Sequence, residues 1–178
     1  MPSGGRERPR LILLTGASSV GKTVVGRSLQ SITGTPAVFI TGDSLDLPRE
    51  ARARRLLHAS PPAEAARIQS QLDAAYLHAL DAFVEHGLHA IGEVVFKEPA
   101  RTTAWMKVLS DMPHLLIRLR CDADVRRARE SARGDRAMGL SDETCGTDNP
   151  PTVHFDADLD TSAATPQEIA EAICALLD

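Results

Sequence analysis

The chain has few aromatic residues, few cysteines and no long apolar run. Aromatics make up only 3% of its 178 residues, so aliphatic side chains must build the core, which suits a small α/β domain better than an all-β sandwich. The three cysteines, Cys121, Cys145 and Cys174, are too few and too far apart for a disulfide framework or a zinc site. No run approaches the roughly 20 apolar residues that cross a bilayer. These absences predict a soluble, cytoplasmic protein that contacts no membrane.

The net charge and the length of the chain indicate which partners and how many domains to expect. The formal net charge is −4, and no basic stretch is interleaved with aromatics, so no nucleic acid partner is expected. A length of 178 residues predicts one domain spanning residues 1–178. Residues 1–9 are rich in Gly, Pro and Arg and predict a flexible tail. The sequence leaves the oligomeric state open and is compatible with a homo-oligomer.

A glycine-bounded octapeptide stands directly after the apolar run 11–14. It consists of Gly16, Ala17, Ser18, Ser19, Val20, Gly21, Lys22 and Thr23. This spacing is typical of a P-loop, whose backbone N–H groups cradle phosphate oxygens at the positive end of the following helix. Lys22 is expected to reach the β- and γ-phosphates, and the Thr23 hydroxyl to bind Mg²⁺. The motif therefore predicts ATP and Mg²⁺ as cofactors.

The rest of the chain alternates strand-like and helix-like segments. Strands are predicted at 10–15, 37–41, 88–94, 114–120 and 153–159, and helices at 22–31, 63–86, 100–110, 122–133 and 166–177. This alternation predicts an α/β P-loop kinase fold, a five-stranded parallel sheet with helices on both faces. Two segments, 43–62 and 134–151, interrupt the rhythm. Together with the helices beside them, we interpret residues 43–87 as an acceptor-binding segment and 129–151 as a lid.

Acidic residues near the predicted strand ends are candidates for acceptor chemistry. The guanine-reading sequence Asn-Lys-x-Asp of GTPases is absent. Phosphoryl transfer to a small molecule instead needs an orienting carboxylate and cations around the transferring group. Asp43 follows the second strand and either accepts the acceptor's proton or caps a helix. Glu93 closes the third strand and either binds Mg²⁺ through water or orients the acceptor. The alternative is a surface glutamate at a strand end or a partner for a lid arginine. Arg52 lies in an arginine group that suits an acidic acceptor.

A second set of candidates follows the fourth strand. Arg129, Arg133 and Arg136 are spaced so that they can clamp phosphates as a lid closes, with Arg129 expected at the nucleotide. The alternative is a solvated helix face, expected to include Arg126 or Arg127. Thr161 leaves the last strand and either lines the nucleotide pocket or only ends the strand.

Several of these motifs together resemble one family. They are residues 16–23, Gly42-Asp43-Ser44-Leu45, Arg120-Cys121-Asp122, the stretch 129–136 and the stretch 156–161. They resemble the chloramphenicol phosphotransferase family of P-loop kinases. The resemblance implies ATP- and Mg²⁺-dependent transfer of a γ-phosphate to a hydroxyl of an antibiotic. It also implies that Asp43 is the general base and that Arg133 and Arg136 belong to the lid.

The sequence departs from that family where the acceptor is expected to bind. Residues 47–82 are Arg- and Ala-rich, and Glu93 and Val94 stand where the family pattern has two aspartates. Our leading hypothesis is an O-phosphotransferase acting on a hydroxylated small molecule, an antibiotic or an intermediate of antibiotic biosynthesis. One alternative is a kinase acting on a nucleotide, a shikimate-like compound or a sugar acid. Another is a regulatory module that binds ATP without transferring it.

Overall fold

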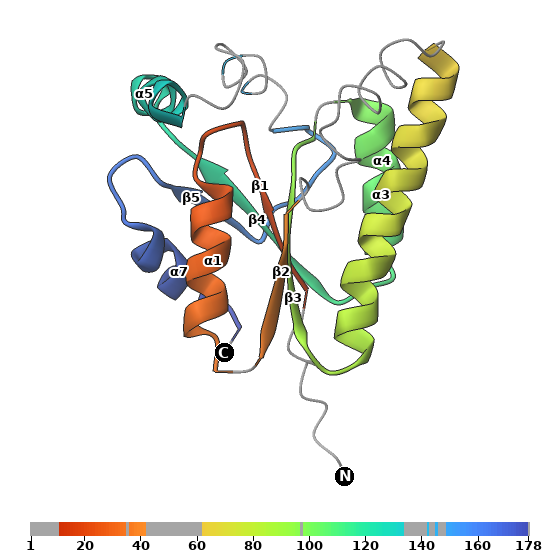
Figure 1. Cartoon of the computed structure of the whole chain (residues 1–178), viewed down its shortest axis with the longest axis horizontal. Coiled ribbons are helices and arrows are strands. Elements are labelled where there is room, and N and C mark those ends of the chain that lie inside the picture. Colours follow the sequence, from red (N-terminus) through yellow and green to blue (C-terminus); the bar gives the residue numbers. More distant parts are fainter. Residues whose placement is uncertain are drawn as a thin grey trace.

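The computed structural model describes residues 11–34, 36–41, 62–96, 98–133, 142, 145 and 149–177. Within these residues a parallel five-stranded sheet runs in the order β2-β3-β1-β4-β5 (Figure 1). Its strands are β1 Leu11–Thr15, β2 Ala37–Ile40, β3 His89–Val94, β4 His114–Arg120 and β5 Ala157–Asp160. The predicted fold class is thereby confirmed.

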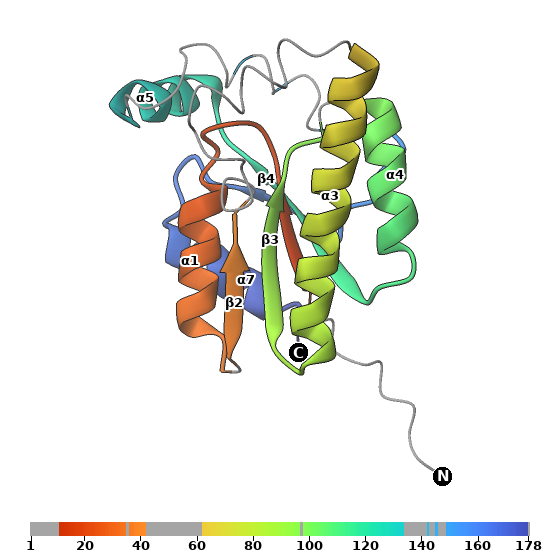
Figure 2. The same cartoon turned by 45° about the vertical axis from the view of Figure 1, so that its right-hand side comes forward.

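Helices cover both faces of this sheet. They are α1 Lys22–Ile32, α3 Pro62–Glu85, α4 Pro99–Leu109, α5 Ala123–Arg133 and α7 Pro166–Cys174. Helices α1 and α7 lie on one face and α3 and α4 on the other (Figure 2). Thr165 caps α7 by accepting a hydrogen bond from the N–H of Glu168. The helix begins at Pro166, as predicted.

Two predicted boundaries are wrong at the end of the chain. The last strand begins at Ala157 instead of Val153, because Val153 donates its N–H to Pro150 in a turn. The carboxylate of Asp156 then accepts the N–H of Leu116 at 2.7 Å and takes the place of a strand partner. The last helix ends at Cys174, three residues before the predicted end at 177.

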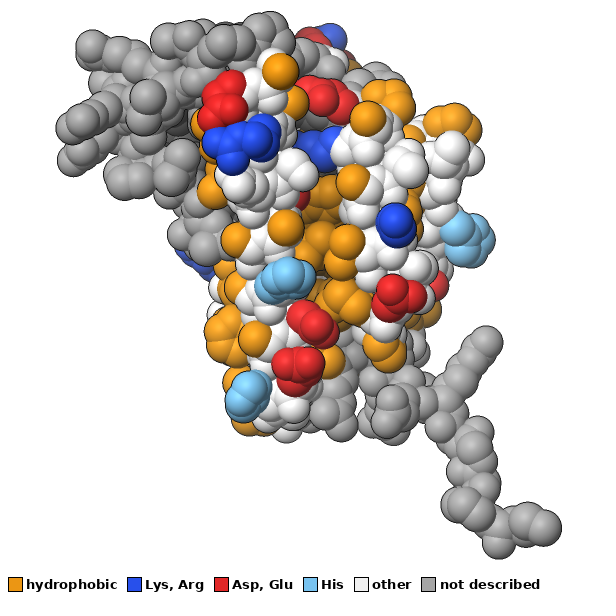
Figure 3. Space-filling view, turned by 90° about the vertical axis from the view of Figure 1, so that its right-hand side faces the viewer, with side chains coloured by type: hydrophobic (Ala, Val, Ile, Leu, Met, Phe, Trp, Pro, Cys, Tyr) orange, Lys and Arg blue, Asp and Glu red, His pale blue; other side chains and the backbone are white. Residues whose placement is uncertain are grey.

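The core is divided by the sheet into two layers. Leu11 and Leu13 of β1 point toward α3 and α4, whereas Ile12 and Leu14 point toward α1 and α7. All four side chains are fully buried, since a central parallel strand is covered on both faces. Figure 3 views the α3 and α4 side, where hydrophobic side chains fill the seam between the two helices.

This arrangement brings the carboxyl ends of the strands to one edge, where ligands of open α/β sheets bind. The P-loop follows β1, Glu93 lies near the end of β3, and Thr161 follows β5.

Several predicted features lie outside the described residues. They are the 1–9 tail, Asp43, Arg52, Arg136, the side chain of Arg133, the 43–61 stretch and most of the 134–151 stretch. In the described part of the chain, no helix is long and apolar enough to span a bilayer.

Candidate active site

The loop between β1 and α1 has the backbone geometry of a phosphate cradle. Gly16 has φ +135, and a Cβ built there would lie 2.3 Å from the carbonyl oxygen of Leu119 on β4. Gly21 has φ +102 and Ser19 has φ 63, so the chain turns through left-handed conformations before the helix. Only glycine fits at Gly16, because any side chain would collide with a neighbouring strand.

Lys22 lies over this loop from the first turn of α1. Its Nζ donates hydrogen bonds to the carbonyls of Gly16 at 2.8 Å and Ala17 at 2.7 Å. Gly21 caps α1 without any side chain that could accept from the first N–H groups of the helix. Those N–H groups, the helix dipole and the ammonium charge converge at the loop, which is the arrangement that binds phosphate.

Thr23 and Glu93 are in contact, although they lie on different elements. The Thr23 hydroxyl donates to a carboxylate oxygen of Glu93 at 3.1 Å. The register of β1 and β3, in which Leu14 pairs with Glu93, places this glutamate beside the strand that feeds the P-loop. A hydroxyl and a half-buried carboxylate at this spacing form an oxygen pair that suits Mg²⁺, which keeps most of its waters.

The carbonyl of Val20 in the P-loop is contacted by two residues from the second half of the chain, Thr161 and Arg129. It accepts a hydrogen bond from the Thr161 hydroxyl at 2.7 Å and lies 3.4 Å from Nη1 of Arg129. Arg129 also donates to the Thr161 carbonyl at 2.7 Å and lies close to the Cys121 sulfur. Arg129 and Thr161 were both predicted to bind the nucleotide, and the structure brings both onto the P-loop backbone. We call this pair the clamp.

Besides Arg129, helix α5 carries Arg126 and Arg127, which both pair with Asp142. Arg127 is solvated, as the alternative interpretation of this helix expects, and it pairs with Asp124 and Asp142. Arg126, the other residue named in that interpretation, is instead buried and donates to the Cys121 carbonyl and to Asp142. The two guanidinium groups lower the pKa of Asp142, chiefly by hydrogen bonding from Arg127. Asp142 therefore ties the segment that follows α5 to this helix.

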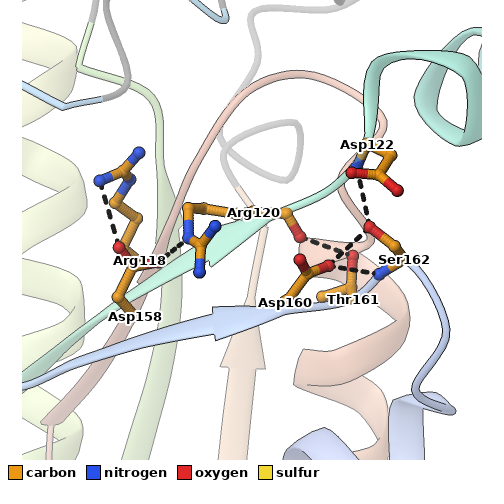
Figure 4. A network of polar contacts seen from close by, with 7 residues as sticks. All are labelled: Arg118, Arg120, Asp122, Asp158, Asp160, Thr161 and Ser162. Atoms are coloured by element: carbon orange, nitrogen blue, oxygen red, sulfur yellow. Dashed lines mark hydrogen bonds and ion pairs between the residues drawn. The ribbon is translucent and has the colours of Figure 1, made fainter.

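Beside this clamp, the ends of β4 and β5 form a polar network that the sequence did not predict (Figure 4). Asp158 pairs with Arg120 at 2.6 Å and with Arg118 at 3.3 Å. Asp160 accepts hydrogen bonds from the hydroxyl and the N–H of Ser162, which lower its pKa. The sequence signal was the Asp-x-Ser spacing, which is typical of an Asx turn. The network fixes the turn that carries Thr161.

A buried tyrosine on α3 was also missed by the sequence interpretation. The hydroxyl of Tyr76 contacts the carbonyl of Ile40 at the end of β2 and the backbone of Glu93 on β3. Tyr76 is the one tyrosine in the chain, but nothing in its sequence neighbourhood marks it as more than a core residue.

The family model of chloramphenicol phosphotransferase-like proteins matches residues 9–178. The chain belongs to this family. The match includes the P-loop, the carboxyl-edge residues and the clamp described above, and it confirms the resemblance inferred from the motifs. A search of curated proteins finds no match to the sequence.

Solved structures share the fold at low identity. A sugar kinase from Janibacter sp. is 19% identical with a TM-score of 0.70, over 96% of this chain and 95% of that one. A gluconokinase from Sinorhizobium meliloti is 21% identical with a TM-score of 0.67, over 97% and 93%. The APS kinase of Mycobacterium tuberculosis in complex with AMPPNP and APS is 17% identical with a TM-score of 0.63, over 96% and 98%. At these identities the likeness shows the P-loop kinase fold alone.

Proposed function

We propose that this protein is an ATP-dependent O-phosphotransferase that moves the γ-phosphate to a hydroxyl of a small molecule. The observation that carries the proposal is the contact between Thr23 and Glu93 beneath a P-loop whose lysine lies over the loop carbonyls. A phosphate cradle and an acidic group at the same sheet edge are what phosphoryl transfer requires. Family membership supports an antibiotic, or an intermediate of antibiotic biosynthesis, as the acceptor.

The described residues account for the binding of the phosphate donor, ATP, and of Mg²⁺. The N–H groups of the loop and of the first turn of α1 bind the phosphates, and Lys22 exchanges its loop carbonyls for phosphate oxygens. Thr23 and Glu93 would hold Mg²⁺, directly and through water, and the ion would supply positive charge to the β- and γ-phosphates. Glu93 would exchange its hydrogen bond from Thr23 for this role.

The acceptor half of the proposal depends on residues outside the described part. Asp43 would accept the proton of the attacking hydroxyl, and Arg133 and Arg136 would offset the charge that develops on the transferring group. Arg52 would contact the acceptor. In-line transfer then depends on how these groups hold the hydroxyl against the γ-phosphate, since the protein supplies positioning and charge and forms no covalent bond itself.

A kinase of primary metabolism is the second candidate. Arg52 and its arginine neighbours Arg49, Arg54 and Arg55 suit an acidic acceptor better than a neutral one. A nucleotide, a shikimate-like compound or a sugar acid would meet that requirement. A regulatory module that binds ATP without transfer is the third candidate. The two carboxylates, Asp43 and Glu93, and the lid arginines argue against it, because binding alone needs no base for an acceptor hydroxyl.

The deciding experiment measures ATP turnover against a panel of hydroxylated antibiotics and acidic metabolites. Stimulation by an antibiotic supports the first candidate, and stimulation by an acidic metabolite supports the second. ATP binding without stimulation by any acceptor would favour the regulatory module. Lys22→Ala should abolish transfer, whereas Lys107→Ala, an exposed lysine on α4, should not. Full activity of Lys22→Ala would contradict the P-loop assignment.

A second variant tests the acceptor side. Asp43→Asn should retain ATP affinity and lower the rate of transfer by roughly a hundredfold or more, because it removes the base and leaves the phosphate cradle intact. Asp111→Asn, at an exposed site after α4, serves as the control. An Asp43→Asn enzyme with the wild-type rate would remove Asp43 from the mechanism.

A further inference from the structure

The tyrosine hydroxyl on α3 lies where two strands of the sheet part. The last paired residues of β2 and β3 are Ile40 and Gly92. Immediately beyond them, the Tyr76 oxygen accepts the N–H of Glu93 at 2.7 Å and donates toward the carbonyl of Ile40 at 2.8 Å. The Glu93 carbonyl lies at 3.2 Å as a second acceptor. The hydroxyl thus bridges the backbones of two neighbouring strands.

The space that this hydroxyl occupies depends on a glycine. A Cβ added at Gly92 would lie 2.8 Å from the Tyr76 oxygen, and equally close to side-chain atoms of Leu13 and Leu80. The ring is held by packing, since Tyr76 is 5% exposed and its centroid lies 5.9 Å from that of Trp105. Burial raises the pKa of the phenol, so the hydroxyl stays protonated and able to donate across the physiological range.

The hydrogen bonds of Tyr76 connect to Glu93 of the proposed site and to Ile40, which lies shortly before the proposed base. The carboxylate of Glu93 accepts the Thr23 hydroxyl, so one continuous series of contacts runs from Ile40 through Tyr76 and Glu93 to Thr23. Ile40 precedes the proposed base Asp43 by three residues in the sequence. A single side chain therefore links the strand that leads to the acceptor segment with the strand that carries the proposed magnesium carboxylate.

We propose that Tyr76 is a positioning residue that fixes the Glu93 carboxylate against Thr23 and sets the separation of the β2 and β3 ends. This inference rests on the proposed phosphotransferase function. Tyr76 touches no reacting group in it and acts through the backbone of Glu93. A purely structural tyrosine would support the stability of the sheet and would leave the magnesium dependence of nucleotide binding unchanged.

The test compares Tyr76→Phe with Thr102→Val. Both changes remove a buried hydroxyl and keep the volume of the side chain, but Thr102 donates to the Glu98 carbonyl in the first turn of α4. Binding of a fluorescent ATP analogue is measured with and without Mg²⁺. For Tyr76→Phe we expect unchanged affinity without Mg²⁺ and a Mg²⁺ requirement raised roughly three- to tenfold, the effect of losing one hydrogen bond. Thr102→Val should match the wild type in both.

Amide hydrogen exchange gives a readout that needs neither metal nor nucleotide. The N–H of Glu93 should exchange faster in Tyr76→Phe than in Thr102→Val, because its acceptor has been removed. If Tyr76→Phe does not fold, Gly92→Ala crowds the same oxygen and should raise the Mg²⁺ requirement in the same direction.

The outcomes separate this inference from the function on which it rests. If the wild type shows no Mg²⁺-dependent nucleotide binding, the proposed function fails and the inference falls with it. If the wild type binds as expected, while Tyr76→Phe keeps the wild-type Mg²⁺ requirement, only the positioning role is overturned, whatever the exchange rate of the Glu93 N–H.

Discussion

The hydroxyl of Thr161 donates a hydrogen bond of 2.7 Å to the carbonyl of Val20, a residue 141 positions earlier in the chain. The same hydroxyl lies 3.0 Å from the carbonyl of Arg120 at the end of β4. Thr161 is 3% exposed, so these hydrogen bonds lie in the protein interior. Hydrogen bonds there are electrostatically stronger than hydrogen bonds in water. The conformation of the P-loop is thus set partly by the turn after β5.

Thr161→Val should weaken ATP binding roughly three- to tenfold, because the Val20 carbonyl loses one donor and the P-loop loses part of its support. Isothermal titration with ATP measures the change. Thr103→Val is the matched control, since its hydroxyl donates to the Pro99 carbonyl on α4 and not to the loop or to the turn after β5. Equal ATP affinities for Thr161→Val and the wild type would contradict this role.

Gly16→Ala should destabilise the fold by about 2 to 5 kcal/mol, the sum of backbone strain and overpacking. The added Cβ would lie 2.3 Å from the backbone of β4, which cannot move aside as a flexible side chain can. Gly34→Ala is the control, because nothing lies within 4 Å of its Cβ. Denaturant unfolding of both variants checks the prediction, which fails if the two are equally stable.

Asp73→Asn should destabilise the packing of α3 against α4 by about 1 to 3 kcal/mol. Its carboxylate accepts two hydrogen bonds from Arg101, at 2.5 and 2.6 Å, and its side chain is only 12% exposed. The control is Glu64→Gln, which breaks a pair of similar geometry with Arg67 whose side chains are 43% and 57% exposed. Chemical denaturation should show no change for the exposed pair. Equal effects would mean that burial does not decide the strength of these pairs.

The start of α7 should respond to acid. The N–H and hydroxyl of Thr165 donate to the Glu168 carboxylate at 2.7 and 2.8 Å and lower its pKa. The folded pKa thus lies below the unfolded value of about 4.3. The stabilisation is therefore present above that value and is lost as the pH falls through the folded pKa.

Glu168→Gln keeps an acceptor for Thr165 but cannot titrate. Thermal unfolding from about pH 6 to about pH 3 should show the wild type losing stability relative to this variant in the acid part of the range. Subtracting the two profiles removes the contributions of the other carboxylates. Profiles that stay parallel would refute the assignment of this acid sensitivity to Glu168.

The segment from β1 to α1 was predictable because its determinants are local. An apolar run, glycines at both ends of the loop and a helical pattern after it lie within about twenty residues of sequence. The other strands were found for the same reason, each from its own apolar run. The start of β5 was not, because the Asp156 side chain substitutes for a strand partner on β4.

The errors and omissions in the site arise from long-range contacts. Arg126 is buried because Asp142, in the following segment, and the Cys121 carbonyl accept from it, which no helical periodicity reveals. The bridge made by Tyr76 needs a particular strand order and a glycine at Gly92. Roles predicted for Asp43, Arg52, Arg133 and Arg136 remain predictions.

The strand order has a consequence for how such a protein can change over generations. β1 stands in the middle, with β2 and β3 on one side and β4 and β5 on the other. The described strands before residue 96 thus lie in the middle and on one side of the sheet, and those after residue 98 lie on the other side. Substitutions in β2 and β3 can therefore remodel one side of the sheet, but the contacts of α3 with α4, Asp73 with Arg101 and Tyr76 with Trp105, tie the two halves of the chain together. Chimeras joined in the link between β3 and α4 would therefore fold well only when both parents carry matching partners for these contacts.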